Sequence, residues 1–240
     1  MSGHNKWSKI KREKGANDAK RGAVFTKLGN QIALAARTGI DPSMNPSLAL
    51  AIEKARAVNM PNANIQRAID RVSDKSAAVL EEITYEGVGP GGIGIIIEAA
   101  TDNKNRTFPE VRTALTKNGG RIADSGSVMF QFSRKGVIIV DAVGEDALLI
   151  VLEAGAEDAN EEDGELVVYT DQKDLNKTRE LIISSGLEVK DAELQYIANT
   201  PIEINDKETA EKLIRLLDAL DDLDDVVNVH SNAEITVDIE

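Results

Sequence analysis

The stretch EITYEGVGPGGIGIIIEA, residues 82–99, decides the fold class of this chain. Its ends are rich in β-branched residues and its centre, Gly87–Gly92, is rich in glycine, so the pattern predicts strands at Glu82–Glu86 and Ile93–Ala99 joined by a tight turn. The glycines also match the dinucleotide-binding pattern G-x-G-x-x-G. That site needs a helix directly after the glycines, whereas the strand-like Ile95–Ile97 follows here. We therefore reject a dinucleotide site and interpret the run as a hairpin whose glycines supply positive φ angles.

The next segment is expected to add a helix and a strand to this hairpin. Thr107 and Glu110 have the spacing of a capping box and predict the start of a helix that ends at Asn118–Gly120. An alternating pattern then predicts a strand at Ser127–Ser133. The apolar residues on one face of that strand are Val128, Phe130 and Phe132.

Residues 136–198 have the pattern of a separate module. The order strand, helix, strand, strand, helix, strand, with similar turns in its two halves, predicts a ferredoxin-like βαββαβ sandwich. The expected elements are the strand Val137–Val140, the helix Glu145–Ala154, the strands Ala156–Ala159 and Leu166–Thr170, the helix Lys173–Ser185 and the strand Leu187–Ile197.

The C-terminal stretch is expected to complete the sheet that the hairpin begins, because residues 82–133 hold too few helices to cover a sheet. The pattern predicts a strand at Pro201–Ile204, a helix capped by Asn205, and strands at Val226–His230 and Glu234–Ile239. The ferredoxin-like module would then be inserted between the two halves of one domain.

Three short amphipathic helices are predicted before the hairpin. The first covers residues 17–38 with Asn17 as its N-cap, the second has Asn45 as cap and Pro46 at its first position, and the third starts at Pro61. We therefore predict an α+β protein with an N-terminal three-helix domain and two α/β sandwich domains, one ferredoxin-like and inserted in the other. The domain boundaries are residues 1–78, residues 79–134 plus 199–240, and residues 135–198.

The charge of the chain is strongly divided along its length. The 240 residues carry 28 Lys/Arg and 41 Asp/Glu, a net charge of -13. Residues 1–75 hold 14 basic and 6 acidic residues, a net +8, which leaves 14 basic and 35 acidic residues, a net -21, for residues 76–240. A cationic end on an anionic protein favours contact with a polyanion such as nucleic acid.

The predicted phosphate contacts lie in the basic N-terminal segment, which we define as residues 1–27. Trp7 lies within this segment, where its ring would either stack on a base or pack on the helices behind it. The predicted nucleic-acid-binding residues are Lys6, Trp7, Lys9, Lys11, Arg12, Lys14, Lys20, Arg21 and Lys27.

Several chemistries are excluded or poorly supported by composition. The chain has no cysteine, which rules out disulfides, a thiolate nucleophile and a Cys-ligated metal. With His4 and His230 as the only histidines, a multi-His metal site is ruled out within one chain and a histidine-based triad is poorly supported. We therefore expect no catalytic residue, no metal and no cofactor. No segment approaches the roughly 18 apolar residues of a membrane span, so we expect a cytoplasmic protein with no membrane partner.

Two acidic runs, at residues 153–165 and 218–225, suggest a cation site or a surface for a basic partner protein. The first run lacks the spacing of an EF-hand loop. The second follows a predicted helix, where negative charge opposes the helix macrodipole. We interpret both runs as solvated segments. The alternative is a cation site for the first run and a surface for a cation or a basic partner for the second.

Short blocks of sequence, ordered along nearly the whole chain, carry a family resemblance. They are Gly3-His4-Asn5-Lys6-Trp7, Asp18-Ala-Lys-Arg-Gly22, Phe25-Thr-Lys27, Asn59-Met-Pro61, Tyr85-Glu-Gly87, Gly89-Pro-Gly-Gly92, Thr101-Asp-Asn-Lys-Asn-Arg-Thr107, Asn118-Gly-Gly120, Gly126-Ser-Val128 and Lys135-Gly136. In these blocks the chain resembles the YebC/PmpR family, which includes the mitochondrial translational activator of cytochrome c oxidase. The resemblance implies three domains, two of them α/β with one inserted in the other, and a non-enzymatic regulator of gene expression. Members have been described as DNA-binding transcriptional regulators and as ribosome-associated translation factors.

Charge and resemblance together favour a nucleic-acid-binding regulator that docks end-on through its basic end. We prefer rRNA on the ribosome over promoter DNA, because no groove-reading motif such as a helix-turn-helix is apparent. The alternatives are a DNA-binding transcriptional regulator, a protein-interaction adaptor and, from another class, an enzyme.

The loop Thr101–Thr107 has two interpretations. Its polar residues either hydrogen-bond the Gly87–Gly92 turn, or Arg106 contacts phosphate as a candidate nucleic-acid-binding residue of the second domain. We favour the structural interpretation, because Asp and Asn before a helix normally bond local backbone groups.

Overall fold

The computed structural model describes residues 21–74 and 78–238 and divides the chain into two compact units. Unit 1 comprises Met1–Phe132 and Ala198–Glu240, and unit 2, Ser133–Ile197, interrupts it in sequence. The contacts separate two units, so the finer division of unit 1 into a helical domain of residues 1–78 and a sheet domain stays a prediction.

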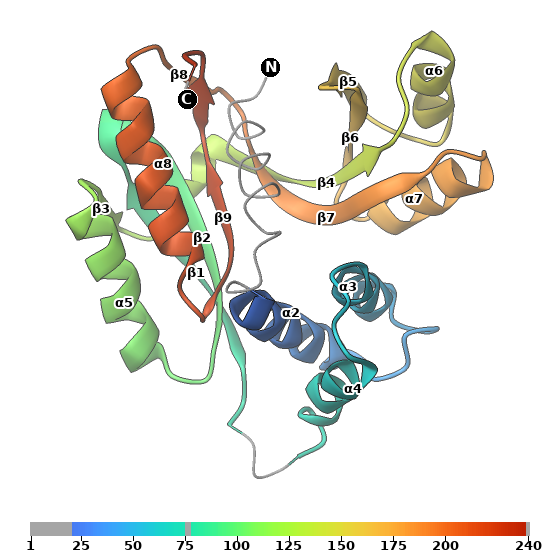
Figure 1. Cartoon of the computed structure of the whole chain (residues 1–240), viewed down its shortest axis with the longest axis horizontal. Helices are drawn as coiled ribbons and strands as arrows, with labels where there is room; N and C mark the ends of the chain where they lie inside the picture. Colours follow the sequence, from blue (N-terminus) through green and yellow to red (C-terminus); the bar gives the residue numbers. More distant parts are fainter. Residues whose placement is uncertain (1–20, 75–77, 239–240) are drawn as a thin grey trace. The chain divides into compact units, whose positions relative to one another are not determined.

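The helical part of unit 1 consists, within the described residues, of α2 (Arg21–Ala36), α3 (Pro46–Ala57) and α4 (Asn62–Asp70) (Figure 1). The expected cap of α3 is confirmed: Oδ1 of Asn45 accepts a hydrogen bond from the Leu48 amide at 3.2 Å. The expected N-cap Asn17 lies outside the described residues. The buried core of this part includes Ile32, Leu48, Ile52, Ile65 and Ile69.

The sheet part of unit 1 is a four-stranded sheet in the order β3-β1-β2-β9. Its strands are β1 (Glu81–Val88), β2 (Gly94–Thr101), β3 (Arg121–Ala123) and β9 (Val226–Ser231), all paired antiparallel. The glycine turn between β1 and β2 is confirmed as the predicted hairpin, and Gly91 and Gly92 have φ angles of 74° and 77°. Because β9 pairs with β2, the C-terminal stretch completes the sheet as expected.

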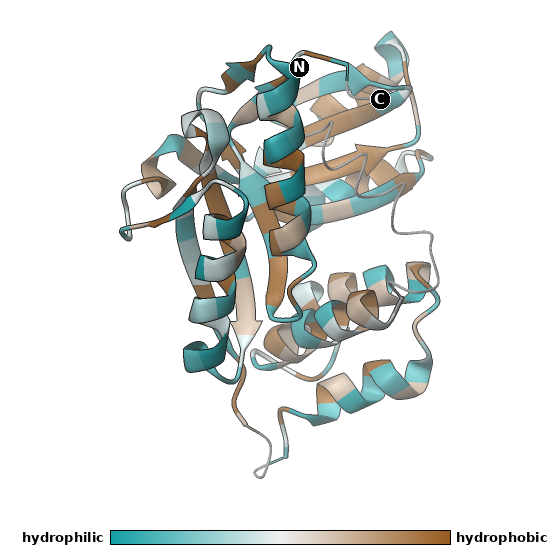
Figure 2. Ribbon diagram, turned by 60° about the vertical axis from the view of Figure 1, so that its left-hand side comes forward, coloured by the Kyte–Doolittle hydropathy of each residue, from teal (hydrophilic) through white to brown (hydrophobic). Residues whose placement is uncertain are grey.

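Two helices, α5 (Lys104–Lys117) and α8 (Lys207–Asp221), pack on one face of this sheet. Ile93, Ile95 and Ile97 meet Leu115 and Leu213 in the largest apolar core of the molecule. Figure 2 shows the strands as largely hydrophobic and the outward sides of these helices as hydrophilic. A short parallel pair, β8 (Ile202–Ile204) and β10 (Ala233–Ile235), completes unit 1.

Two local predictions in the sheet part are wrong. Helix α5 starts three residues before the proposed capping box, with Asn103 as its N-cap, because the Thr107 hydroxyl bonds the distant Asp225 and cannot serve as a cap. Of the strand expected at Ser127–Ser133, only Phe132 and Ser133 are extended, as the start of the next strand, and the residues before them form a turn and the 3-10 helix η3 (Met129–Gln131). The carboxylate of Glu86 explains the difference, because it binds the amides of Gly126, Val128 and Met129 and holds them out of a ladder.

Other boundaries differ by small shifts. The short strand β3 was not predicted, and its three residues are too few to show a period. Helix α8 is capped by Asp206, which accepts from the Thr209 amide at 2.9 Å, and not by Asn205. The side chain of Phe130, expected on the apolar face of a strand, is in the 3-10 helix and 71% exposed.

Unit 2 is the predicted βαββαβ sandwich. Its strands are in the order β5-β6-β4-β7, which places the first and third strands in the centre as in a ferredoxin-like fold. Val137, Ile139 and Val167 form part of its buried core. The elements are β4 (Phe132–Val140), α6 (Glu145–Glu153), β5 (Asp158–Glu162), β6 (Glu165–Asp171), α7 (Leu175–Ser184) and β7 (Val189–Ala198). The α+β fold class is confirmed.

Candidate nucleic-acid interface

The structure describes only part of the predicted phosphate-binding set. Arg21 begins α2, Lys27 follows on the same helix, and Arg106 lies near the start of α5. The set of nine residues in the basic N-terminal segment therefore stays a prediction. The residues outside the described part of the chain are Lys6, Trp7, Lys9, Lys11, Arg12, Lys14 and Lys20.

Lys27 contacts the end of α8. Its Nζ donates to the backbone carbonyl of Asp221 and lies 3.2 Å from Oδ1 of the same residue. The side chains of Lys27 and Asp221 are only 13% and 19% exposed. A cation here offsets the negative C-terminal end of the helix and so reduces the conflict between the second acidic run and the macrodipole. The interpretation of that run as a solvated segment is therefore wrong for Asp221.

Arg106 forms a bidentate ion pair with Asp225. Its Nη2 lies 2.8 Å from each carboxylate oxygen, and its Nε lies 3.2 Å from Oδ2. The hydroxyls of Thr101 and Thr107 also lie 3.0 Å and 2.6 Å from Oδ2. Burial tends to raise the pKa of Asp225, but the hydrogen bonds from Thr107, Arg106 and Thr101 outweigh it and hold that pKa below its ordinary value. Asp225, with only 6% of its surface exposed, is thus a structural carboxylate and not part of a solvated loop.

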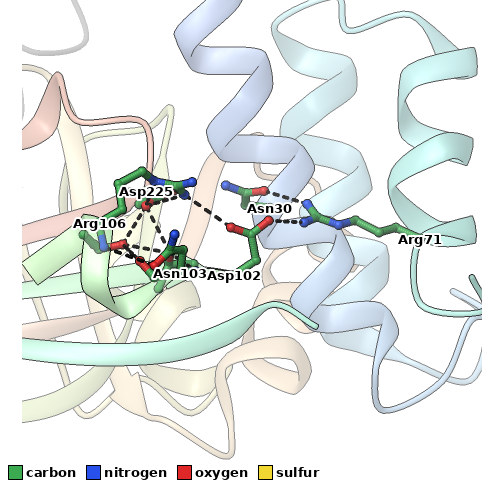
Figure 3. Close-up of polar contacts among 8 residues, drawn as sticks. Asn30, Arg71, Asp102, Asn103, Arg106 and Asp225 are labelled. Atoms are coloured by element: carbon green, nitrogen blue, oxygen red, sulfur yellow. Dashed lines mark hydrogen bonds and ion pairs between the residues drawn. The ribbon is translucent and has the colours of Figure 1, made fainter. Parts of the chain in front are cut away.

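Asp102 extends this network to the helical part of unit 1 (Figure 3). Its Oδ1 lies 3.3 Å from Nη2 of Arg106, and its Oδ2 lies 3.1 Å from Nη2 of Arg71, the residue that follows α4. Arg71 also reaches Asn30 of α2 at 3.5 Å. This network is a series of side chains of alternating charge: Arg71, Asp102, Arg106 and Asp225. It joins the helical part to the sheet part.

The sequence suggested that the loop Thr101–Thr107 hydrogen-bonds the Gly87–Gly92 turn. The structure shows other partners for this loop. Its partners outside the loop include Asp225, which is more than a hundred residues away in sequence, Arg71 and Glu81. The structural role that we favoured for Arg106 agrees with this geometry, although the partner differs. In the sequence, the one sign of a role for Asp225 is that it directly precedes a predicted strand. That signal is weak.

An apolar contact joins the same two parts of unit 1. Ala33 of α2 is buried with Leu80, Ala100 and Val227 from the sheet part. Nη1 of Arg37 donates to the carbonyl of Leu80 at 2.8 Å. The helical part is thus packed on the sheet and not merely tethered to it.

The strongest candidate for acid-base chemistry is a buried pair on β2 and β9. Oε2 of Glu98 lies 2.9 Å from Nε2 of His230, and the two residues are 4% and 3% exposed. Asn228 donates to the same carboxylate oxygen at 3.2 Å. The pair lies across two neighbouring strands, where a cross-strand contact stabilises the sheet. In the described part of the chain, no cluster of three or more His, Asp or Glu is placed to hold a metal ion.

Two arginines on the helical part are open to solvent. Arg56 near the end of α3 and Arg67 on α4 are exposed. Their guanidinium groups have no hydrogen-bond or ion-pair partner among residues 21–74 and 78–238. Sequence reasoning had concentrated on residues 1–27 and did not select them.

Unit 1 as described contains no helix long and apolar enough to cross a bilayer, and the same holds for the helices of unit 2.

Comparison with known proteins gives matches over nearly the whole chain. Residues 5–75 match the family model for the TACO1/YebC protein N-terminal domain, and residues 80–233 match the model for the TACO1/YebC second and third domain. A "Probable transcriptional regulatory protein" of Chloroflexus aurantiacus is 50% identical, and the alignment covers 100% of this chain and 98% of the relative. A relative of the same description from Maridesulfovibrio salexigens is 48% identical over 98% of this chain and 96% of its own.

A solved structure agrees with the fold. The crystal structure of a conserved hypothetical protein from Aquifex aeolicus matches with a TM-score of 0.86 at 42% identity. The match covers 92% of this chain and 93% of that chain.

Proposed function

Since the chain belongs to the TACO1/YebC family, we propose that it is a non-enzymatic regulator of gene expression that binds nucleic acid through its basic N-terminal part. The observation that carries the proposal is the division of charge, +8 for residues 1–75 against -21 for residues 76–240. The printed descriptions of the relatives support a role in regulation.

Electrostatic attraction to the phosphate backbone supplies the mechanism. Each Lys or Arg that neutralises a phosphate releases condensed counterions, which favours binding irrespective of sequence. The lysines and arginines of the basic N-terminal segment would provide most of these contacts, and Arg56 and Arg67 would extend them onto α3 and α4. Lys27 is a weaker candidate than the sequence suggested, because phosphate would have to displace Asp221.

We propose a structured RNA of the ribosome as the target and the cytoplasm as the location. An irregular RNA surface is recognised by shape and backbone contacts, which suits a protein with dispersed cations and no groove-reading helix. The acidic remainder of the chain would then face a basic protein surface. The alternative, a transcriptional regulator that binds DNA, is favoured by the wording of the relatives' descriptions.

Sedimentation with ribosomes in a sucrose gradient tests this proposal. We expect the full-length protein to sediment with ribosomal particles, to be released by nuclease, and to be lost from them in the variant Lys9→Gln/Lys11→Gln/Arg12→Gln. The matched control, Lys173→Gln/Lys177→Gln/Arg179→Gln in unit 2, should still co-sediment. A protein that stays at the top of the gradient while binding duplex DNA tightly would favour the alternative.

Substitution in the full chain is a sharper test than removal of residues 1–75. The truncation would uncover Ala100 and Val227, which pack on Ala33, and would leave Asp102 without Arg71. A loss of binding in such a fragment would then mix a loss of contacts with a loss of folding.

A further inference from the structure

Helix α5 is a basic element in an otherwise acidic part of the chain. All five Lys/Arg of residues 79–132 fall between Lys104 and Arg121, a segment with Glu110 as its single carboxylate. The whole of residues 76–240 has a net charge of -21, so this concentration of cations is not a general property of the region. A cationic helix in such surroundings favours an anionic partner.

Two of these five cations have partners among the residues of unit 1 that the structure describes, and three do not. Lys104 pairs with Glu81 at 2.6 Å, and Arg106 pairs with Asp225. Arg112, Lys117 and Arg121 are exposed, and their charged groups have no hydrogen-bond or ion-pair partner among the described residues. A ligand could therefore bind these three cations without displacing any contact within residues 21–74 and 78–238.

The outward residues of α5 form one continuous stripe. Arg112 lies one turn after Phe108, and Thr116 lies one turn after Arg112. The stripe borders the buried side of the helix, where Val111 and Leu115 lie in the core. A shallow depression of about 400 Å³ runs along this stripe. We call this surface the α5 face; it is lined by Phe108, Pro109, Arg112, Thr113, Thr116 and Lys117.

Phe108 adds an aromatic surface to the cations. Its side chain is 40% exposed, although the chain has only four phenylalanines. The centre of its ring lies 5.9 Å from that of Tyr85, at a tilt of 46°. Tyr85 thus supports the ring from the protein side and leaves part of it open to solvent.

We propose that the α5 face binds a single-stranded segment of nucleic acid, an inference that rests on the proposed function. Arg112 and Lys117 contact the phosphate backbone, and an unpaired base stacks on Phe108. Cations along a groove beside an exposed aromatic ring are the combination by which proteins bind single strands. An acidic peptide would also pair with the cations, but it has no base to stack on the ring. The exposed ring of Phe108 therefore favours nucleic acid over an acidic peptide.

The proposal changes the docking that charge separation alone predicts. Contact at α5 brings the sheet part of unit 1 to the nucleic acid, in addition to the basic N-terminal segment. Docking is then not end-on but involves two separate sets of cations.

The test is the affinity of the full-length protein for a fluorescently labelled single-stranded RNA oligonucleotide, measured by anisotropy over a range of salt. Arg112→Gln/Lys117→Gln should weaken binding about tenfold and reduce the magnitude of the slope of log K against log salt by about 1.4, since each single-strand phosphate contact contributes about 0.7. The matched control is Lys212→Gln/Arg215→Gln, which makes the same charge change on exposed residues of α8, where Glu208 and Glu211 already pair with the cations. The control should bind as the wild type does.

Two further measurements separate the stacking and the location from general charge effects. Phe108→Leu keeps an apolar contact with Tyr85 but removes the ring, so it should weaken binding of single strands and leave duplex binding unchanged. In the wild-type protein, bound oligonucleotide should protect Lys117, but not Lys212, from acetylation. The acetylation experiment uses the wild-type protein, so its result is valid even if a variant folds poorly.

The outcomes distinguish this inference from the proposed function. If Arg112→Gln/Lys117→Gln binds as tightly as wild type while Lys9→Gln/Lys11→Gln/Arg12→Gln binds weakly, the α5 proposal is overturned and the proposed function stands. Equal losses in the α5 and α8 variants would also overturn it, because general charge would explain both. If the wild-type protein binds no nucleic acid, both proposals fail.

Discussion

Asp225 shows how a single buried carboxylate organises unit 1. It accepts hydrogen bonds from two threonines and a bidentate contact from Arg106, and Asp102 continues the network to Arg71. Its position in a run of aspartates gave no indication of these partners. Hydrogen bonds to an ionised group are stronger than those between neutral groups, so the removal of one donor should be measurable.

Thr107→Val tests the contribution of one such donor at constant shape. The Thr107 side chain is 1% exposed and its hydroxyl lies 2.6 Å from Asp225, so we expect a loss of about 1.5–3 kcal/mol in the free energy of unfolding. The control is Thr116→Val on the exposed side of the same helix, which should change stability little. Calorimetry of the two variants checks the prediction, and equal unfolding curves would contradict it.

The ionisation of Asp225 should make stability depend on pH in the acid range. Because its pKa is lower in the folded protein than in the unfolded chain, its contribution is complete above about pH 4 and is lost as the pH falls through the folded pKa. Asp225→Asn cannot ionise, so its melting temperature should lie below that of the wild type at pH 7, and the difference should shrink below about pH 4. Asp124→Asn, at an exposed carboxylate, should follow the wild type throughout. A difference that stays constant with pH would contradict this account.

At the scale of elements, local signals were sufficient where partners lie close in sequence. Asn45 and Pro46 predicted the start of α3, and alternation and turns predicted the order of strands and helices in unit 2. The start of α5 was misplaced because Thr107 bonds a residue far away in sequence. The strand predicted at Ser127–Ser133 was wrong for the residues before Phe132, because Glu86 binds the amides of Val128 and Met129. Both errors come from tertiary contacts, which a local pattern does not contain.

A substitution at Gly136 of β4 tests how tightly the elements of unit 2 pack. A Cβ at this position would lie 2.9 Å from Cβ of Leu175 and would also meet the Thr170 hydroxyl, in backbone that needs no glycine conformation. Gly136→Ala should therefore cost about 1–3 kcal/mol through overpacking. Gly29→Ala in α2, where nothing lies within 4 Å, should be neutral or stabilise by up to about 1 kcal/mol. Calorimetry of both variants checks this, and an unchanged transition for Gly136→Ala would contradict it.

At the scale of the whole molecule, the sequence predicted the inserted module and the division of charge, which need only order and composition. It could not predict which cations have internal partners. Lys27 was predicted as a phosphate contact and Arg106 was a candidate for one, yet both are paired with aspartates. By contrast, Arg56, Arg67, Arg112 and Lys117 were not selected and are exposed. Pairing depends on which residues meet in three dimensions, so it could be seen only in the structure.

The salt dependence of binding by the full-length protein tests the central claim most directly. If the basic N-terminal part binds phosphate, the affinity for single-stranded RNA should fall steeply as salt rises, by about 0.7 in the slope of log K against log salt for each contact. Lys9→Gln/Lys11→Gln/Arg12→Gln should then reduce the magnitude of that slope by about 2. A flat salt dependence of the wild type, or a triple variant with the wild-type slope and affinity, would contradict the account.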